Sequence, residues 1–512
     1  MSALELFVRD LMEWKLAFLA VPTLIIAWLS CKFLFLDAFM SPLRNLPGPP
    51  TSMFLGNLLE LKRKDSFRAT SEWSKKYGGI FVMWLRPDRP LVYLTDTDLV
   101  KQVLVTNCYK YLRPSLVRLL MPPLGNSLLT SNGKDHAWQR KMINPAFSYT
   151  NLKGMVPFMK TAADDLVQFW KEKLQQSQKD YADIMVQSDL LRLALDIVGQ
   201  SAFGYQFKSV RGGDTEITNA FNHMSTGVDL GRFSLLTLPF FKYLPLKENR
   251  LKSNATKITN EVVMKVIKER HRMKETGRQP AHRDLLDIAM DMVDDQTGIR
   301  MYDDQLRALV FTFLFAGHET TGVSMSWTLY ELAKYPKIQE KIRKEANEVL
   351  GDGTDITWAK LDELQYLSNV IKESMRLHPA VTQVGRESAQ NDTLGGNHIP
   401  ANTHFLIGIH VIHRSEKYWQ DPETFKPERF ENLTKEQESL VRYILMPFSF
   451  GPRMCIGNKL AMAEMRLVLA SLLQRFIFSP VPGFPEVKPK MSLTAKPFPL
   501  LQLRIRAVEN DA

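Results

Sequence analysis

The residues best suited to chemistry lie near the carboxyl end, where one cysteine is found in a short loop rich in glycine and arginine. The stretch reads Phe448-Ser-Phe-Gly451-Pro-Arg453-Met-Cys455-Ile-Gly457. Gly451 and Gly457 allow backbone geometry and close approaches that a Cβ would prevent, while Phe448 can shield the sulfur from water. Arg453 supplies a permanent cation whose fork of donors suits a carboxylate. One thiolate held in this way can serve as the ligand of a haem iron.

The fixed positions of this loop match F-x-x-G-x-R-x-C-x-G, which rarely happens by chance in a chain of 512 residues. A buried structural cysteine is the alternative, but inert burial requires neither Arg453 nor the two glycines. The loop resembles the haem-ligand loop of the cytochrome P450 family. That resemblance implies that Cys455 is the axial ligand of a haem b iron, and that Phe448, Gly451, Arg453 and Gly457 surround the cofactor.

A second group of chemical residues, Ala316-Gly317-His318-Glu319-Thr320-Thr321, lies within a helix expected over 302–335. Glycine beside hydroxyl side chains is unfavourable in a helix interior, and such a breach of a local rule often marks function. We expect a gap in the helix that admits dioxygen and water, with Thr320 holding a water and Glu319 linking it to solvent protons. The hexapeptide is similar to the family's [A/G]-G-x-[D/E]-T-[T/S] pattern. Thr320 and Glu319 are therefore the expected catalytic residues, with Ala316 beside the cofactor.

Two alternative functions of this segment, a zinc site and a haem-ligating histidine, are disfavoured. A zinc protease would require H-E-x-x-H, but the residue four positions after His318 is Gly322. His318 as a haem ligand is the other alternative, and Cys455 is the stronger candidate for that role.

Haem carries two propionates, so further cations are expected around it. The family usually has W-x-x-x-R before a Pro-Ala-Phe segment, and alignment on that segment places His136 in the tryptophan position and Arg140 in the arginine position. Trp138 breaks this register, so the donor at 136 stays open. Arg386 matches another propionate-binding arginine of the family. For each of these residues alone, a surface position is the alternative.

A charge network is expected to support the cysteine loop. Glu373 and Arg376 are three residues apart on a predicted helix, where an exposed salt bridge would be the default interpretation. Downstream, Phe425-Lys-Pro-Glu-Arg429-Phe430 matches a second family segment. The resemblance implies a buried triad of Glu373, Arg376 and Arg429 with a structural role.

The elements that must position these residues belong to a large globular chain. It has 512 residues, 45% of them hydrophobic, and only three cysteines, which is too few for a disulfide framework. No CxxC motif suggests zinc. The net charge of +11 suits anionic membrane surfaces or acidic partner proteins. Nucleic-acid binding is disfavoured because the basic residues form no long run and no recognition motif accompanies them.

The amino-terminal segment is predicted to be a membrane anchor. Leu16 to Cys31 is apolar and uncharged, and apolar residues resume after Lys32, so the stretch approaches the length that a spanning helix needs. A cleaved signal peptide is the alternative, but acidic residues precede the run. The excess of Lys and Arg after the segment favours a cytosolic catalytic body. We therefore expect a single-pass protein of the endoplasmic reticulum membrane, as in microsomal members of the family.

The proline-rich stretch Leu46 to Pro50 divides the chain into an anchor at 1–45 and a haem domain at 46–512. The expected fold is mainly α with a small β region, the cytochrome P450 fold preceded by one transmembrane helix. Periodicity predicts an early β-hairpin over 80–94 and an apolar segment at 233–246 that is either a core loop or a flap dipping into the bilayer. The long helices are predicted at 154–176, 185–203, 255–273, 303–335 and 337–350.

The resemblance implies a monooxygenase that inserts one oxygen atom of O2 into a lipophilic substrate such as a fatty acid, sterol, terpenoid or xenobiotic. Electrons are expected from NADPH-cytochrome P450 reductase, with cytochrome b5 as a further candidate donor, because the chain has no dinucleotide-binding fingerprint. A haem-thiolate isomerase or dehydratase that needs no reductase is the first alternative, and a non-enzymatic haem or lipid carrier is the second.

Overall fold

The computed structural model describes most of the chain. It describes residues 21–508, apart from 25–26, 29–39, 53–54, 87–88, 115–116, 118–120, 214, 226–243, 245, 278–282 and 296. Among the described residues, no helix is both long enough and apolar enough to cross a membrane. The predicted anchor lies largely outside the described residues, as does the apolar segment at 233–246.

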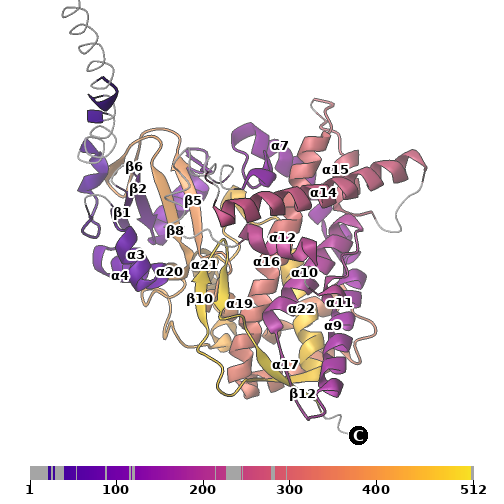
Figure 1. The fold of residues 1–512 in the computed structure, drawn as a ribbon. Helices are drawn as coiled ribbons and strands as arrows, with labels where there is room; N and C mark the ends of the chain where they lie inside the picture. Colours follow the sequence, from indigo (N-terminus) through magenta and orange to yellow (C-terminus); the bar gives the residue numbers. More distant parts are fainter. Residues whose placement is uncertain are drawn as a thin grey trace, which may run out of the picture.

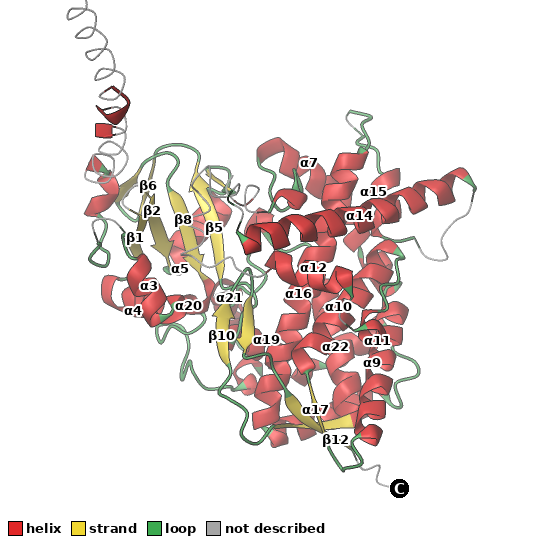
Figure 2. Cartoon of the chain, viewed as in Figure 1, coloured by secondary structure: helices red, strands yellow, loops and turns green. Residues whose placement is uncertain are grey.

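Helices make up the larger part of the molecule. Most of them lie to one side of the sheet that contains β1, β2, β8 and β5 (Figures 1 and 2). The α-helices are α3 (Leu58–Lys64), α4 (Ser66–Tyr77), α5 (Thr97–Lys101), α7 (Gly133–Ile143), α8 (Tyr149–Lys153), α9 (Val156–Gln176), α10 (Val186–Phe203), α11 (Ser209–Gly212), α12 (Glu216–Ser225), α14 (Lys247–Glu275), α15 (Leu285–Asp291), α16 (Asp303–Lys334), α17 (Pro336–Leu350), α18 (Trp358–Glu363), α19 (Gln365–Leu377), α20 (Ile409–Ile412), α21 (Lys435–Ile444) and α22 (Asn458–Arg475). Short helical turns are η2 (Pro42–Asn45), η3 (Gln102–Thr106), η4 (Pro122–Leu124), η5 (Asn144–Phe147), η7 (Pro427–Phe430) and η8 (Gly451–Arg453). The five predicted long helices are confirmed as α9, α10, α14, α16 and α17, although α14 begins eight residues before its predicted start.

In the part of the chain that the structure describes, the strands form one larger sheet and three small ones. They are β1 (Ile80–Arg86), β2 (Arg89–Leu94), β3 (Tyr111–Leu112), β4 (Ala182–Ile184), β5 (Gln383–Ser388), β6 (Asp392–Leu394), β7 (Asn397–Ile399), β8 (His404–Gly408), β9 (Phe476–Pro480), β10 (Lys488–Met491), β11 (Ala495–Phe498) and β12 (Leu503–Ala507). The five-stranded sheet has the order β1-β2-β8-β5-β3. Within it, β1 and β2 form the predicted hairpin, with Ile80 opposite Leu94, and β2 pairs with β8 in parallel. The smaller sheets are β4-β12-β9, β10-β11 and β6-β7.

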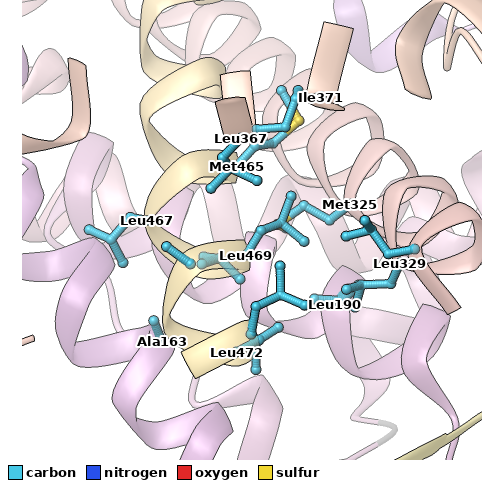
Figure 3. Close-up of a cluster of buried hydrophobic side chains, with 14 of the residues drawn as sticks. Ala163, Leu190, Met325, Leu329, Leu367, Ile371, Met465, Leu467, Leu469 and Leu472 are labelled. Atoms are coloured by element: carbon cyan, nitrogen blue, oxygen red, sulfur yellow. The ribbon is translucent and has the colours of Figure 1, made fainter. Parts of the chain in front are cut away.

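The largest hydrophobic core lies where α9, α10, α16, α19 and α22 meet (Figure 3). Leu190 of α10, Met325 and Leu329 of α16, and Leu469 and Leu472 of α22 are fully or almost fully buried there. Fully burying a side chain of this size is worth about 1.5–3 kcal/mol relative to leaving it exposed. Because α22 follows the cysteine loop and α16 carries the Ala316–Thr321 segment, this core fixes the two helices that hold the chemical residues.

Candidate active site

The cysteine loop lies between α21 and α22 and is held by its own backbone. Cys455 N donates to Phe448 O at 3.0 Å, and Met454 N donates to Gly451 O at 3.0 Å. Gly451 has a left-handed φ of +77°, and a Cβ at this position would collide with the carbonyl oxygen of Leu104. Gly451 is therefore required both for its conformation and for a close approach of two chain segments.

Within the protein itself, Gly457 meets neither of the two conditions that apply to Gly451. Its φ is −86°, which any residue adopts, and a Cβ there would meet only Phe147, at 3.8 Å. Gly457 acts on the sulfur through its backbone N–H, which lowers the pKa of the Cys455 thiol. Its contact with a cofactor stays a prediction.

The environment of Cys455 opposes a free thiolate. Burial raises the pKa of the thiol, and the Gly457 N–H and the charge of Arg140 lower it only in part. Cys455 nevertheless keeps accessible surface, which leaves room for a ligand beside it. A bound metal cation would favour deprotonation in such a place. On the protein side, Phe448 is half-buried and packs against the main core.

Four arginines and one histidine lie close together beside the loop, although they are far apart in sequence. They are Arg113, Arg140, Arg386, Arg453 and His136. Arg453 Nη2 donates to Asn132 Oδ1 at 3.0 Å. The Asn132 side chain also accepts from Arg113 N and donates to Arg113 O. Arg140 Nη1 donates to Met454 O at 2.8 Å, which ties α7 to the cysteine loop. Arg386 Nη1 donates to Gly385 O at 2.8 Å.

This cluster lacks negative charge. Among the described residues, no carboxylate forms an ion pair with Arg113, Arg386 or Arg453, and each of the three has a buried nitrogen without a hydrogen-bond partner. Burial lowers the pKa of Arg113 and of Arg453 to about 10, and the pKa of Arg386 falls well below its ordinary value, first through burial and then through the neighbouring arginines. Burial and the surrounding cations lower the pKa of His136 to about 3. An anionic group is needed to balance these charges.

Haem fits this arrangement. Its two propionates would supply the negative charge, the partnerless arginine nitrogens are the donors that carboxylates require, and Cys455 is the single soft ligand that an iron needs on one side. A cavity of about 590 Å³ lies at the edge of the cluster and is lined by residues that include Cys108, His136, Arg140 and Arg453. The propionate contacts of His136, Arg140, Arg386 and Arg453 stay predictions.

The register around Trp138 can be compared with the geometry. His136 is buried, lines the cavity and is under the charge of Arg140 and Arg453. Trp138 is on the same helix, but it packs against a hydrophobic cluster formed largely by α12, α14, α15 and α16. The positions favour His136 as the residue on the side of the basic cluster.

The distal segment differs from the expectation of a gap. The helix α16 runs without interruption through Ala316–Thr321, and Thr320 Oγ1 donates back to Ala316 O at 2.7 Å. Gly317 therefore does not open the helix. A Cβ at this position would lie 3.0 Å from Val198 Cγ2, so glycine here allows close packing against α10. Ala316 is exposed and Thr320 half-buried on a helix whose other residues near them are mostly buried, which marks this face as the open one.

Glu319 and His318 point into the protein interior. Glu319 is 2% exposed, and its Oε1 accepts from Thr494 Oγ1 at 2.6 Å and pairs with Lys496 Nζ at 3.3 Å. Glu319 and Thr320 are thus neighbours in sequence with different partners. His318 is buried, bonds Leu314 O at 2.8 Å through Nδ1 and packs 5.0 Å from Phe221, and burial lowers its pKa. These contacts give His318 a packing role rather than that of a metal ligand.

The buried triad is confirmed. Arg376 Nε and Nη2 donate to the two carboxylate oxygens of Glu373 at 2.8 and 2.9 Å, and Arg429 Nε donates to Glu373 Oε1 at 2.9 Å. The side chains of Glu373 and Arg376 are fully buried. Arg376 Nη1 also donates to His413 O at 2.8 Å, and Met446 N donates to His413 Nε2 at 2.9 Å. Through His413, the triad therefore reaches the segment that leads into the cysteine loop.

His413 makes the stability of this support dependent on pH. Burial lowers the pKa of His413 from 6.5 to about 3, and the charge of Arg376 acts in the same direction. Its Nε2 accepts a hydrogen bond from Met446 N. Between these two values the unfolded chain binds a proton that the folded chain excludes, so stability falls as the pH drops through that window. We expect urea unfolding to show a smaller loss of stability between about pH 7 and about pH 4.5 for His413→Gln, whose amide oxygen still accepts a hydrogen bond.

The control for this prediction is His398→Gln, because His398 is exposed on β7. The control should lose as much stability as the wild type over the same pH range. An identical pH profile for His413→Gln and the wild type would contradict the prediction.

Sequence reasoning missed several residues of the site. Arg113 and Asn132 follow no motif, and their role appears only where the chain brings them beside Arg453. Thr494 and Lys496 lie more than 170 residues after Glu319, in a strand region without a recognisable pattern. The excess of arginine over nearby acidic residues was the only signal available for Arg113.

Comparisons with known proteins agree with this geometry. The family model described as Cytochrome P450 matches residues 46–503. The chain is 31% identical over 479 residues to "Cytochrome P450 4A24" of Sus scrofa, which covers 91% of this chain and 92% of that protein. It is 31% identical to "Cytochrome P450 4d2" of Drosophila melanogaster, over 88% of this chain and 91% of that protein. It is also 31% identical to "Cytochrome P450 monooxygenase 128" of Postia placenta, over 93% of both chains.

Proposed function

The chain belongs to the cytochrome P450 family and is a haem monooxygenase, and we propose that it oxygenates a lipophilic substrate with electrons from an NADPH-dependent reductase. The observation that carries this proposal is the pairing of an accessible cysteine, Cys455, with a cluster of arginines that lacks negative charge. A haem bound there would have both its iron and its propionates satisfied.

In this proposal the residues of the chain divide the work. Cys455 would ligate the iron, and the backbone N–H of Gly457 lowers the pKa of its thiol. Arg113, Arg386 and Arg453 would hold the propionates through their partnerless nitrogens. Haem supplies the chemistry by which one atom of O2 enters the substrate and the other leaves as water. The protein supplies binding, orientation and the exclusion of solvent.

Proton supply falls to α16. The Thr320 hydroxyl lies on the open face of the helix and can exchange its bond to Ala316 O for one to a water molecule. Glu319, the neighbouring carboxylate, is the proton carrier behind it. His318 takes no part, because its ring is engaged by Leu314 O and Phe221.

The partners are proposed on electrostatic and compositional grounds. The net charge of +11 suits an acidic reductase and an anionic membrane surface, and the apolar stretch from Leu16 to Cys31 suits an anchor. We place the enzyme on the endoplasmic reticulum membrane with its catalytic body in the cytosol, where NADPH-cytochrome P450 reductase and cytochrome b5 would reach it.

Reconstitution tests this function. Purified full-length protein in liposomes is mixed with NADPH-cytochrome P450 reductase, and fatty acids, sterols, terpenoids and xenobiotics are screened for shifts of the Soret band. Compounds that shift the band are then incubated with heavy-isotope O2. We expect a product that carries one labelled oxygen atom and forms only with NADPH and reductase. A product formed equally well without NADPH would replace this proposal by an isomerase or dehydratase.

A further inference from the structure

The hairpin of β10 and β11 is fixed against α16 and the segment before β5. Ala495 N donates to Ala380 O at 2.9 Å, and Trp327 Nε1 of α16 donates to Ala495 O at 2.7 Å. On the neighbouring strand, Thr382 Oγ1 donates to Met491 Sδ at 3.3 Å. Both strands are thus bonded to the protein body at the turn that joins them, so the residues of this turn have defined positions.

Two residues of this hairpin reach the same oxygen of Glu319. Thr494 and Lys496 flank Ala495, and alternate residues of an extended chain point to the same side. The hydroxyl of Thr494 and the ammonium of Lys496 both contact Glu319 Oε1, at 2.6 and 3.3 Å. Thr494 is 2% exposed, whereas the Lys496 side chain is 14% exposed and so retains contact with solvent.

The second oxygen of Glu319 is different. Oε2 is buried and accepts no hydrogen bond from any described residue. A buried carboxylate oxygen without a partner is costly unless water or another donor satisfies it. With Oε1 held by two donors, Oε2 is the oxygen left to exchange a proton.

We propose that Thr494 and Lys496 are positioning residues that hold Glu319 by Oε1 and leave Oε2 to take part in proton delivery. The inference rests on the proposed monooxygenase function and deepens it, because it assigns the orientation of the proton carrier to a hairpin far away in sequence. Lys496 also gives the buried carboxylate the opposite charge that it needs to be tolerated in the interior.

Two substitutions of Lys496 and one matched control test the proposal in the full-length holoenzyme. Lys496→Met removes the ammonium and Lys496→Arg retains a cation. Lys488→Met removes a lysine of the same hairpin whose ion pair among the described residues is with the exposed Glu486. We expect Lys496→Met to lower product formed per NADPH by about tenfold, a part of the roughly 10²–10⁴-fold that a positioned proton donor contributes. Lys496→Arg should recover most of the coupling, meaning the product formed per NADPH consumed, and Lys488→Met should match the wild type.

Two readouts separate positioning from a general structural effect. The stretching frequency of carbon monoxide on the reduced enzyme, measured by infrared spectroscopy, should shift in Lys496→Met and return in Lys496→Arg. In a Glu319→Gln background, Lys496→Met should cause no further loss of coupling, because both changes act on one carboxylate. Haem content, measured from the carbon monoxide complex, is compared for every variant.

Thr494 gives an independent arm if Lys496→Met fails to fold. Thr494→Val removes the hydroxyl at nearly the same volume and should lower coupling, and Thr494→Ser should restore it. Wild-type coupling in Lys496→Met or Thr494→Val, or a further loss on the Glu319→Gln background, overturns the inference. If the wild-type enzyme itself forms no oxygenated product, the proposed function fails instead.

Discussion

Replacing Cys455 by serine should abolish oxygenation and remove the red-shifted Soret band that a thiolate-ligated reduced haem gives with carbon monoxide. Serine has almost the same size, so the loop keeps its bonds from Cys455 N to Phe448 O and from Met454 N to Gly451 O. What is lost is the thiol, whose pKa is raised by burial and lowered by the Gly457 N–H and the charge of Arg140. A hydroxyl is far harder to deprotonate than a thiol, so no comparable anionic ligand remains.

Cys108→Ser is the matched control, because Cys108 is the other free cysteine among the described residues and lines the cavity beside Arg453. We expect this variant to retain both the spectrum and product formation. Oxygenation by Cys455→Ser at the wild-type rate would remove the basis for the proposed site. Absorption spectra of both variants and product analysis decide between these outcomes.

Replacing Glu373 by glutamine should destabilise the protein strongly and lower its haem content. The change strands Arg376, which is fully buried, and weakens the hold on Arg429, whose side chain is 10% exposed. Removing one partner of a buried ion pair costs about 3–5 kcal/mol. The backbone bond from Lys426 N to Glu373 Oε1, at 2.9 Å, is lost or weakened as well.

The control is Glu416→Gln, which breaks the exposed pair of Lys75 and Glu416, whose side chains are about 70% exposed. An exposed pair of this kind is worth roughly 0–1 kcal/mol. Urea unfolding and the carbon monoxide spectrum of both variants give the comparison. If both variants were equally stable and equally loaded with haem, the triad would have no special role in supporting the loop.

Local patterns predicted much of this molecule. The long helices were predictable because their apolar residues repeat with helical spacing over many turns, as in α9 and α17. The cysteine loop and the triad were predictable because each lies within a short segment that matches a family pattern. The bond from Met446 N to His413 Nε2, by contrast, joins residues 33 positions apart and has no sequence signal.

The errors have a common physical cause. Gly317 was interpreted from its local effect on a helix, whereas it is required by Val198 on a neighbouring helix. Glu319 was expected to link Thr320 to solvent protons, but a hairpin near the carboxyl end covers it. In each case a segment distant in sequence determines the outcome, and a pattern of adjacent residues contains no information about such a segment.

The arginine cluster beside the cysteine loop also affects the abundance of this protein in the cell. Without an anion, Arg113, Arg386 and Arg453 repel one another in a poorly hydrated interior. A ligand that binds only the folded chain raises its stability by mass action. Chains synthesised while haem is scarce would therefore unfold more often and be degraded sooner. The supply of cofactor would set the lifetime of the polypeptide as well as its activity.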